Sequence, residues 1–320
     1  MKKHEEMNTP IGRFQDSYFT RSESQHLNCT EFINGNQKAI ELYVRSGRMT
    51  LDQPLKLPMN CDSIRRRLFG KPPSFEKLKR SILFVRNIYQ SYEMQEVFLS
   101  MTYHPDHFYC YAVDLKSDKR FKESMRQLAG CFENVLVLEK EYDFDRAGHK
   151  QDEAHFDCMK HFLAAKWNHA ITLQNFDLII KTAEQLSKLS ELLNYTSIMG
   201  SDAALKDRYN VNADWTPAGM KLFKKECKSK WLRHSICVLG VEYLEDLSKS
   251  PMILANKVVQ DFDFGTVLCV REMMMDKKTG KLPDAGWLSA RFPQFKEMQM
   301  KRNGTFDKSS FDCSTVKPLE

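Results

Sequence analysis

The stretch SILFVRNIY, residues 81–89, decides the fold class, because it is a continuous apolar run of the kind found in strands buried on both faces. A segment with helical spacing follows at residues 93–101. The pattern then repeats, with FYCYAV at 108–113 as a second strand and residues 121–128 as a second helix. Such alternation predicts an α/β fold with a mainly parallel sheet flanked by helices.

The alternation continues with a strand at 134–138, a helix at 155–166 and a fourth strand at 170–173. In sheets of this kind, ligands bind beyond the carboxyl ends of the strands. The aspartates that follow the strands are therefore candidate binding residues, although loops after strands are often simply polar: Asp114, Asp143, Asp145 and Asp177.

The bulk composition is that of a globular protein with a real core, since 42% of the 320 residues are hydrophobic and 28% are charged. The net charge of +6 is spread along the chain without a nucleic-acid recognition motif, so we expect no nucleic-acid partner. Residues 1–80 mix polar runs and prolines with a short helical pattern at 32–44, which predicts a stem or peripheral region.

The nine cysteines stand apart rather than in CxxC pairs, which favours disulfides over zinc and hence a secretory compartment. Nine reduced cysteines in a cytosolic core are the alternative. The glycosylation sequons at Asn28, Asn194 and Asn303 agree with secretion. The chain shows neither a signal peptide nor a run of about 18 apolar residues, so we expect an N-terminus that lacks a native anchor.

Four blocks of sequence occur in the order typical of one enzyme family: residues 108–138, 154–163, 167–182 and 233–264. They contain an FYC strand with an Asp-x-Lys turn, the segment AHFDCMKHFL, a W…L…D…KT block, and a C-terminal block with an Ala-Asn-Lys signature. Together they resemble the core-2/I-branching β-1,6-N-acetylglucosaminyltransferases (glycosyltransferase family 14), most closely the nematode members, with an internal deletion.

The resemblance implies a GT-A-like nucleotide-sugar-binding fold whose second half is incomplete. Residues 81–193 would form the nucleotide-sugar-binding half, 194–236 a shortened acceptor or catalytic region, and 237–320 the C-terminal family block and tail. The family implies a Golgi membrane protein, luminal side, held by an N-terminal anchor that is absent here. It transfers N-acetylglucosamine from UDP-N-acetylglucosamine to the 6-hydroxyl of a glycan acceptor, with inversion and with no metal or other cofactor required.

The resemblance also implies the donor-binding residues. Main-chain groups after the first strand would hold the base, and the Asp-x-Lys turn would reach the ribose, where a carboxylate can accept both hydroxyls. An equal alternative for His149 is that it stands at the start of a helix and binds no ligand. The positions that match are Asn87, Ile88, Tyr89, Asp114, Leu115, Lys116, Arg146 and His149.

Two Asp-x-Asp sequences, at 143–145 and 261–263, have the spacing of a metal motif. The resemblance places neither at the usual metal position, so both are interpreted either as structural or as acting on the site only through other residues.

By their positions in the blocks, six cysteines should form the pairs Cys29–Cys237, Cys61–Cys131 and Cys110–Cys158. Cys227, Cys269 and Cys313 are then left without assigned partners.

The catalytic base cannot be assigned to any residue. In the family it is a glutamate between the KT block and the C-terminal block, which are separated here only by residues 183–236, with a junction near Glu226-Cys227. Lys228, Lys230 and Arg233 near this junction either contribute cations or form a solvated linker. We therefore expect an impaired transferase. The alternatives are an inert secretory-pathway protein that retains at most UDP-sugar binding, and a chain that does not fold stably.

Overall fold

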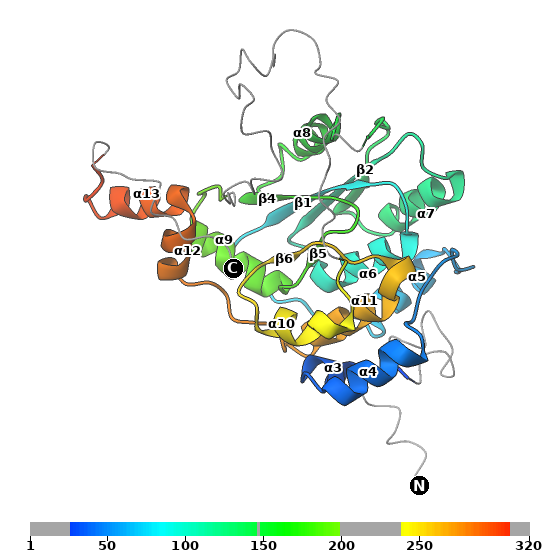
Figure 1. Ribbon diagram of the computed structural model, residues 1–320. Helices are drawn as coiled ribbons and strands as arrows, with labels where there is room; N and C mark the ends of the chain where they lie inside the picture. Colours follow the sequence, from blue (N-terminus) through cyan, green and yellow to red (C-terminus); the bar gives the residue numbers. More distant parts are fainter. Residues whose placement is uncertain (1–25, 146–147, 199–237, 308–320) are drawn as a thin grey trace, which may run out of the picture. The chain divides into compact units, whose positions relative to one another are not determined.

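A computed structural model describes residues 26–145, 148–198 and 238–307 (Figure 1). The described residues up to 195 and those of 238–283 form one compact unit, and those of 196–198 and 284–307 belong to a second. In the described part of the chain, no helix is both long and apolar enough to cross a membrane.

The first unit is built on a four-stranded parallel sheet, as the strand and helix alternation predicted. Its strands are β1 (Ile82–Ile88), β2 (Phe108–Val113), β3 (Val135–Val137) and β4 (His169–Leu173), in the order β3-β2-β1-β4. β1 lies between two partners and is buried at every position. This explains its continuous apolar run, because helices cover both faces.

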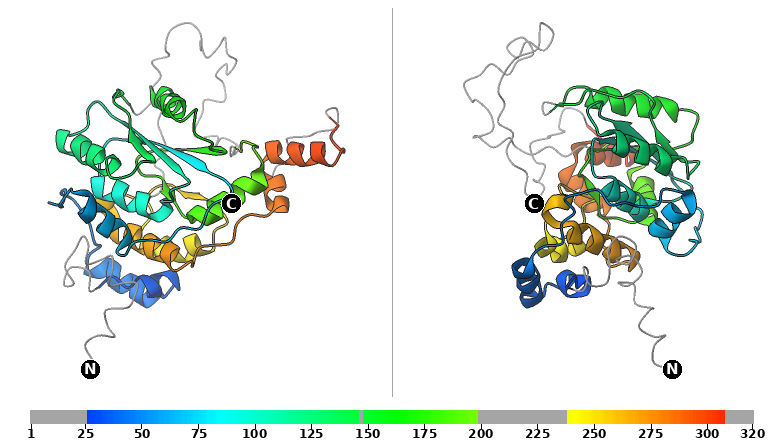
Figure 2. Two further views of the ribbon diagram at one scale, coloured as in Figure 1. Left: turned by 180° about the vertical axis from the view of Figure 1, so that it is seen from behind. Right: turned by 90° about the vertical axis from the view of Figure 1, so that its right-hand side faces the viewer.

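Helices cover the two faces of this sheet unequally (Figures 1 and 2). On one face α8 (Gln151–His161) packs alone among the described helices, with Ala154 and Cys158 in the core. The other face carries α6 (Tyr92–Thr102), α7 (Lys119–Ala129) and α9 (Ala183–Leu193). The fold is therefore a three-layer α/β arrangement.

A further layer joins the beginning and the end of this unit. Tyr43 and Ile64 are almost fully buried there, so the region that we expected to be a stem or periphery contributes to the core. Its elements are α3 (Cys29–Ile33), α4 (Gln37–Ser46), α5 (Cys61–Phe69), η3 (Val241–Tyr243), α10 (Leu244–Lys249) and α11 (Gln260–Met275). Close by, β5 (Leu178–Ile179) pairs antiparallel with β6 (Leu254–Ala255).

Asp263, the last residue of one Asp-x-Asp sequence, is a structural carboxylate, as expected. It is fully buried at a kink within α11. It accepts hydrogen bonds from the Tyr43 hydroxyl at 2.7 Å and from Arg48 at 2.8 Å. It also accepts from the backbone N–H of Val241 at 3.2 Å. One carboxylate thus ties α4, η3 and α11 together.

Three disulfides cross the first unit. Cys61–Cys131 and Cys110–Cys158 are the expected pairs. The expected pair Cys29–Cys237 is wrong, because Cys29 is bonded to Cys269. α3 packs against α11, and both sulfurs belong to fully buried residues whose Cα atoms lie 5.0 Å apart. The remaining cysteines, Cys227, Cys237 and Cys313, lie outside the described residues.

The second unit contains α12 (Ala285–Arg291) and α13 (Pro293–Arg302). Asp284 caps α12 by accepting from the Trp287 N–H at 2.7 Å. Pro293 begins α13, where its missing N–H costs nothing. The sequon residue Asn303 follows α13 and is exposed.

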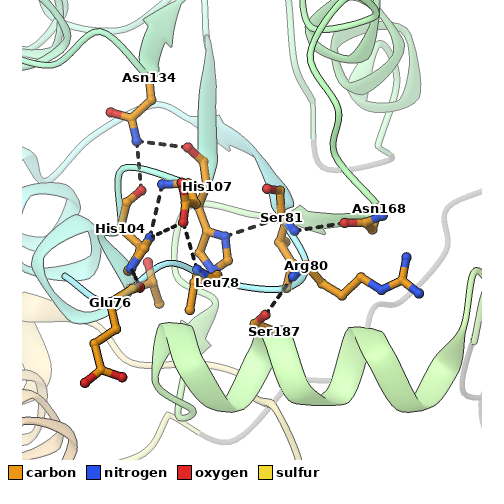
Figure 3. Close-up of polar contacts among 12 residues, drawn as sticks. Glu76, Leu78, Arg80, Ser81, His104, His107, Asn134, Asn168 and Ser187 are labelled. Atoms are coloured by element: carbon orange, nitrogen blue, oxygen red, sulfur yellow. Dashed lines mark hydrogen bonds and ion pairs between the residues drawn. The ribbon is translucent and has the colours of Figure 1, made fainter.

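Polar side chains close the amino-terminal edge of the sheet (Figure 3). The ring Nδ1 of His107 accepts from the Ile82 N–H at 3.2 Å. The Asn134 amide donates to the carbonyls of His104 and His107, both at 2.9 Å. The Ser81 N–H donates to the Asn168 side chain at 2.9 Å. These contacts satisfy backbone groups that the strand ladder leaves open.

The His107 contact predicts acid lability. Burial, with a contribution from His104, lowers the pKa of His107 to about 4, while the backbone of Ala183 and the charges of Asp106 and Glu184 oppose the shift. The pKa of His107 is lower in the folded state than in the unfolded chain, so neutral His107 contributes about 3 kcal/mol to the free energy of unfolding. This contribution is complete above about pH 6.5 and is lost as the pH falls toward 4.

The measurement is urea unfolding of the wild type and of His107→Asn at pH 7 and pH 4.5. Asparagine can still accept from Ile82 but does not titrate, so the variant should lose less stability on acidification. His161→Asn, at an exposed position in α8, is the control and should follow the wild type. An equal loss in wild type and His107→Asn would contradict the prediction.

Candidate functional site

The candidate site lies at the carboxyl edge of the sheet, where the ends of β1 and β2 adjoin the segment after β3. The Asp114 N–H donates to the carbonyl of Ile88 at 2.9 Å, and the Leu115 N–H donates to that of Tyr142 at 2.8 Å. The sequence positions after β1 and β2 are therefore brought side by side.

Asp114 is the central carboxylate of this edge and is 6% exposed. Its Oδ1 accepts from the Lys116 N–H at 2.8 Å, which forms a tight turn. Its Oδ2 makes no hydrogen bond within the described part of the chain. Asp114 can therefore accept hydrogen bonds from a ligand without breaking the turn.

Lys116 is a cation held among carboxylates. Its Nζ forms an ion pair with Asp143 and lies 3.4 Å from Asp114 Oδ1. It also donates to the carbonyl of Phe144 at 2.5 Å. The hydrogen bond to Asp143, followed by the charge of Asp114, raises the pKa of Lys116. Lys116 is thus a fixed positive charge with a side chain that is 58% exposed.

His149 pairs with Asp145 in the loop before α8. The two side chains meet at 2.5 Å between Nδ1 and Oδ2, and the His149 N–H donates to Asp145 Oδ1 at 3.0 Å. Both side chains are about half exposed. Arg146, the neighbouring donor-binding candidate, lies outside the described residues.

Asn87 and Tyr89 line the edge after β1. Asn87 is buried and donates to the carbonyl of Gln151 at 3.2 Å, which ties β1 to α8. Tyr89 is 41% exposed. Partial burial, together with the charges of Asp261 and Asp114, raises the pKa of its phenol, so Tyr89 presents a neutral ring at the site.

Lys257 was not among the predicted site residues, although it lies in the Ala-Asn-Lys signature. The segment from β6 reaches the same edge because β6 pairs with β5. Asn256 donates to Asp177, and Lys257 Nζ lies 5.9 Å from the centre of the Phe176 ring. That ring packs edge-on against Tyr89 at 5.6 Å. The site therefore has a second cation.

Asp177, a candidate binding residue, instead holds a turn. One oxygen accepts from the Gln174 N–H at 2.7 Å and the other from Asn256. The buried Arg86 donates to the carbonyls of Gln174 and Asp177, both at 2.8 Å. No group of three or more acidic, histidine or cysteine side chains within the described ranges is arranged to hold a metal ion.

The sequence of this region matches a known family. Residues 82–245, about half of the chain, match the family described as "Branch: Core-2/I-Branching enzyme". The chain belongs to this family.

Relatives from the core-2/I-branching family share 26–30% identity with the chain. The human β-1,3-galactosyl-O-glycosyl-glycoprotein β-1,6-N-acetylglucosaminyltransferase is 27% identical over 183 residues, 53% of this chain and 43% of that protein. A pig protein named probable β-1,3-galactosyl-O-glycosyl-glycoprotein β-1,6-N-acetylglucosaminyltransferase 7 is 30% identical over 136 residues, which are 41% of this chain and 32% of that protein. The bovine herpesvirus 4 enzyme is 26% identical over 196 residues, which are 58% of this chain and 45% of that protein. The chain thus spans less than half the length of these relatives.

Proposed function

We propose that this chain binds UDP-N-acetylglucosamine at the carboxyl edge of the sheet. The observation that carries the proposal is the Asp114–Lys116 turn, hydrogen-bonded to the end of β1 within the region that matches the family. Asn87, Ile88 and Tyr89 would hold the base, and Asp114 would accept the ribose hydroxyls. Leu115 presents an exposed apolar surface beside them.

Two cations would stabilise the diphosphate in this site. Lys116 is held at the turn, and Lys257 lies over Phe176. Positive side chains can stabilise a departing diphosphate in the way that a metal ion does in other transferases. We propose accordingly that no metal or other cofactor is required, and that Arg146 and His149 add donor contacts.

The reaction that we propose is inverting transfer of N-acetylglucosamine to the 6-hydroxyl of a glycan acceptor, impaired in this form. Such a transfer needs a carboxylate that takes the proton of the acceptor hydroxyl. Asp143 is paired with Lys116, and Asp177 holds its turn. These pairings favour a second candidate function, an inert protein that binds the donor without transferring the sugar.

The place of action would be the secretory pathway, on the luminal side of the Golgi. The three disulfides support an oxidising compartment. Glycans would be attached at Asn28, Asn194 and Asn303, of which Asn28 and Asn303 are exposed and Asn194 is half-buried.

Calorimetric titration of the oxidised chain with UDP tests the site. Asp114→Ala should weaken binding by about 10- to 100-fold, because a charge-assisted hydrogen bond to the ribose is lost. Asp106→Ala is the control, since Asp106 accepts from the Leu78 N–H near the opposite edge of the sheet. It should leave the affinity for UDP unchanged. A wild-type chain that binds no UDP would contradict the proposal.

A transfer assay separates the two candidate functions. The donor is UDP-N-acetylglucosamine and the acceptor a β-1,3-galactosyl-O-glycosyl glycopeptide, the class in the relatives' names. Binding with slow transfer supports the impaired enzyme, and binding without transfer supports the inert protein.

A further inference from the structure

Asn175 occupies the turn between β4 and β5, at the edge where the nucleotide would bind. It is 2% exposed, and its side-chain Oδ1 accepts from the backbone N–H groups of Tyr89 at 2.8 Å and Gln90 at 3.3 Å. Its own carbonyl accepts from the buried Gln95 side chain at 3.1 Å. Asn175 thus fastens the loop after β1 and the first turns of α6.

The residue after Asn175 extends this connection toward Lys257. The centres of the Phe176 and Tyr89 rings lie 5.6 Å apart, and Lys257 Nζ lies 5.9 Å from the centre of the Phe176 ring. The Phe176 carbonyl accepts from the Val258 N–H at 3.4 Å. The turn therefore contacts both the loop that would hold the base and the segment that carries the second cation.

The turn between β4 and β5 is closed without the side chain of Asn175. Gln174 and Asp177 are already bonded to each other at 2.7 Å, and both carbonyls are held by Arg86. The Asn175 side chain takes no part in closing the turn, because its oxygen accepts its hydrogen bonds from the loop after β1. Its nitrogen Nδ2 is buried and makes no hydrogen bond among the described residues.

We propose that Asn175 is a positioning residue of the uridine nucleotide site. Its side-chain oxygen fixes the backbone of Tyr89 and Gln90, so that the base-contacting loop is held in one arrangement with Phe176 and Lys257. Because Asn175 is buried, it acts through Tyr89 and not by touching the nucleotide. This inference rests on the proposed binding of UDP at the same edge.

The experiment measures the affinities of UDP and uridine by calorimetry, together with the melting temperature, for three asparagine variants. Asn175→Ala removes the acceptor and should weaken binding of both ligands by about tenfold or more, because two backbone donors lose their partner. Asn175→Asp keeps the acceptor oxygen and should bind uridine nearly as well as the wild type. Uridine is the informative probe for this variant, since it carries no phosphate for the new carboxylate to repel.

The matched control is Asn134→Ala. Asn134 is also a buried asparagine in a loop of the same sheet, but it bonds His104 and His107 at the opposite edge. It should lower the melting temperature without changing either affinity. If Asn175→Ala does not fold, Phe176→Leu provides a second test, since it removes the ring that contacts both Tyr89 and Lys257 and should weaken UDP binding.

The outcomes distinguish the proposed binding of UDP from the positioning role of Asn175. A wild-type chain that binds neither ligand overturns the proposed function. A wild type that binds UDP, while Asn175→Ala or Phe176→Leu binds it equally well, overturns only the positioning role. Equal losses of affinity in Asn175→Ala and Asn134→Ala would also overturn it, because the effect would then be one of general stability.

Discussion

Replacing both Cys29 and Cys269 by serine should lower the free energy of unfolding by about 5 kcal/mol. The bond joins residues separated by 240 positions, whereas Cys110–Cys158 spans 48. A longer loop restricts the unfolded chain more, so the shorter bond should contribute less, about 4 kcal/mol. Urea unfolding of the two double-serine variants measures both values.

A non-reducing digest checks the pairing behind this prediction. It should link the peptides of Cys29 and Cys269. A peptide that joins Cys29 to Cys237 would contradict the assignment.

The sheet could be predicted from the sequence because its signal is local. The apolar run at 81–89 and the strand-helix alternation after it depend only on neighbours along the chain, and β1 to β4 lie within about one residue of the expected ends. The position of Asp114 followed from the same signal, since a parallel sheet places the residues after each strand at one edge. Lys116 was implied by the resemblance to the family.

The layer that joins α3 to α11 could not be predicted in the same way. Nothing local in the polar segment around Cys29 indicates a partner more than 200 residues away, and order within the family blocks suggested Cys237 instead of Cys269. Lys257 was not predicted for the same reason, because it reaches the site through the pairing of β5 with β6, which are distant in sequence. The helical pattern at 32–44 and the polar segment around Ile64 likewise did not indicate where Tyr43 and Ile64 would be buried.

A buried ion pair between α5 and α6 gives the second large effect. Arg67 donates to both oxygens of Glu96, at 2.7 and 2.8 Å, and to the carbonyl of Pro58 at 2.7 Å. The Tyr92 hydroxyl donates to the same carboxylate at 2.6 Å. Glu96 is fully buried, and α6 follows directly on the loop after β1. The pair thus anchors the helix that leads away from the candidate site.

Glu96→Leu should cost about 3–5 kcal/mol, because it takes both carboxylate oxygens away from a buried guanidinium. Tyr92→Phe removes one hydrogen bond to the same carboxylate and should cost only about 1 kcal/mol. The double variant Arg67→Met with Glu96→Leu should recover much of the loss, since no buried charge is then left without its partner. Urea unfolding at pH 7 ranks the three variants. If Glu96→Leu costs no more than Tyr92→Phe, or the double variant is the least stable, then the ion pair does not anchor α6.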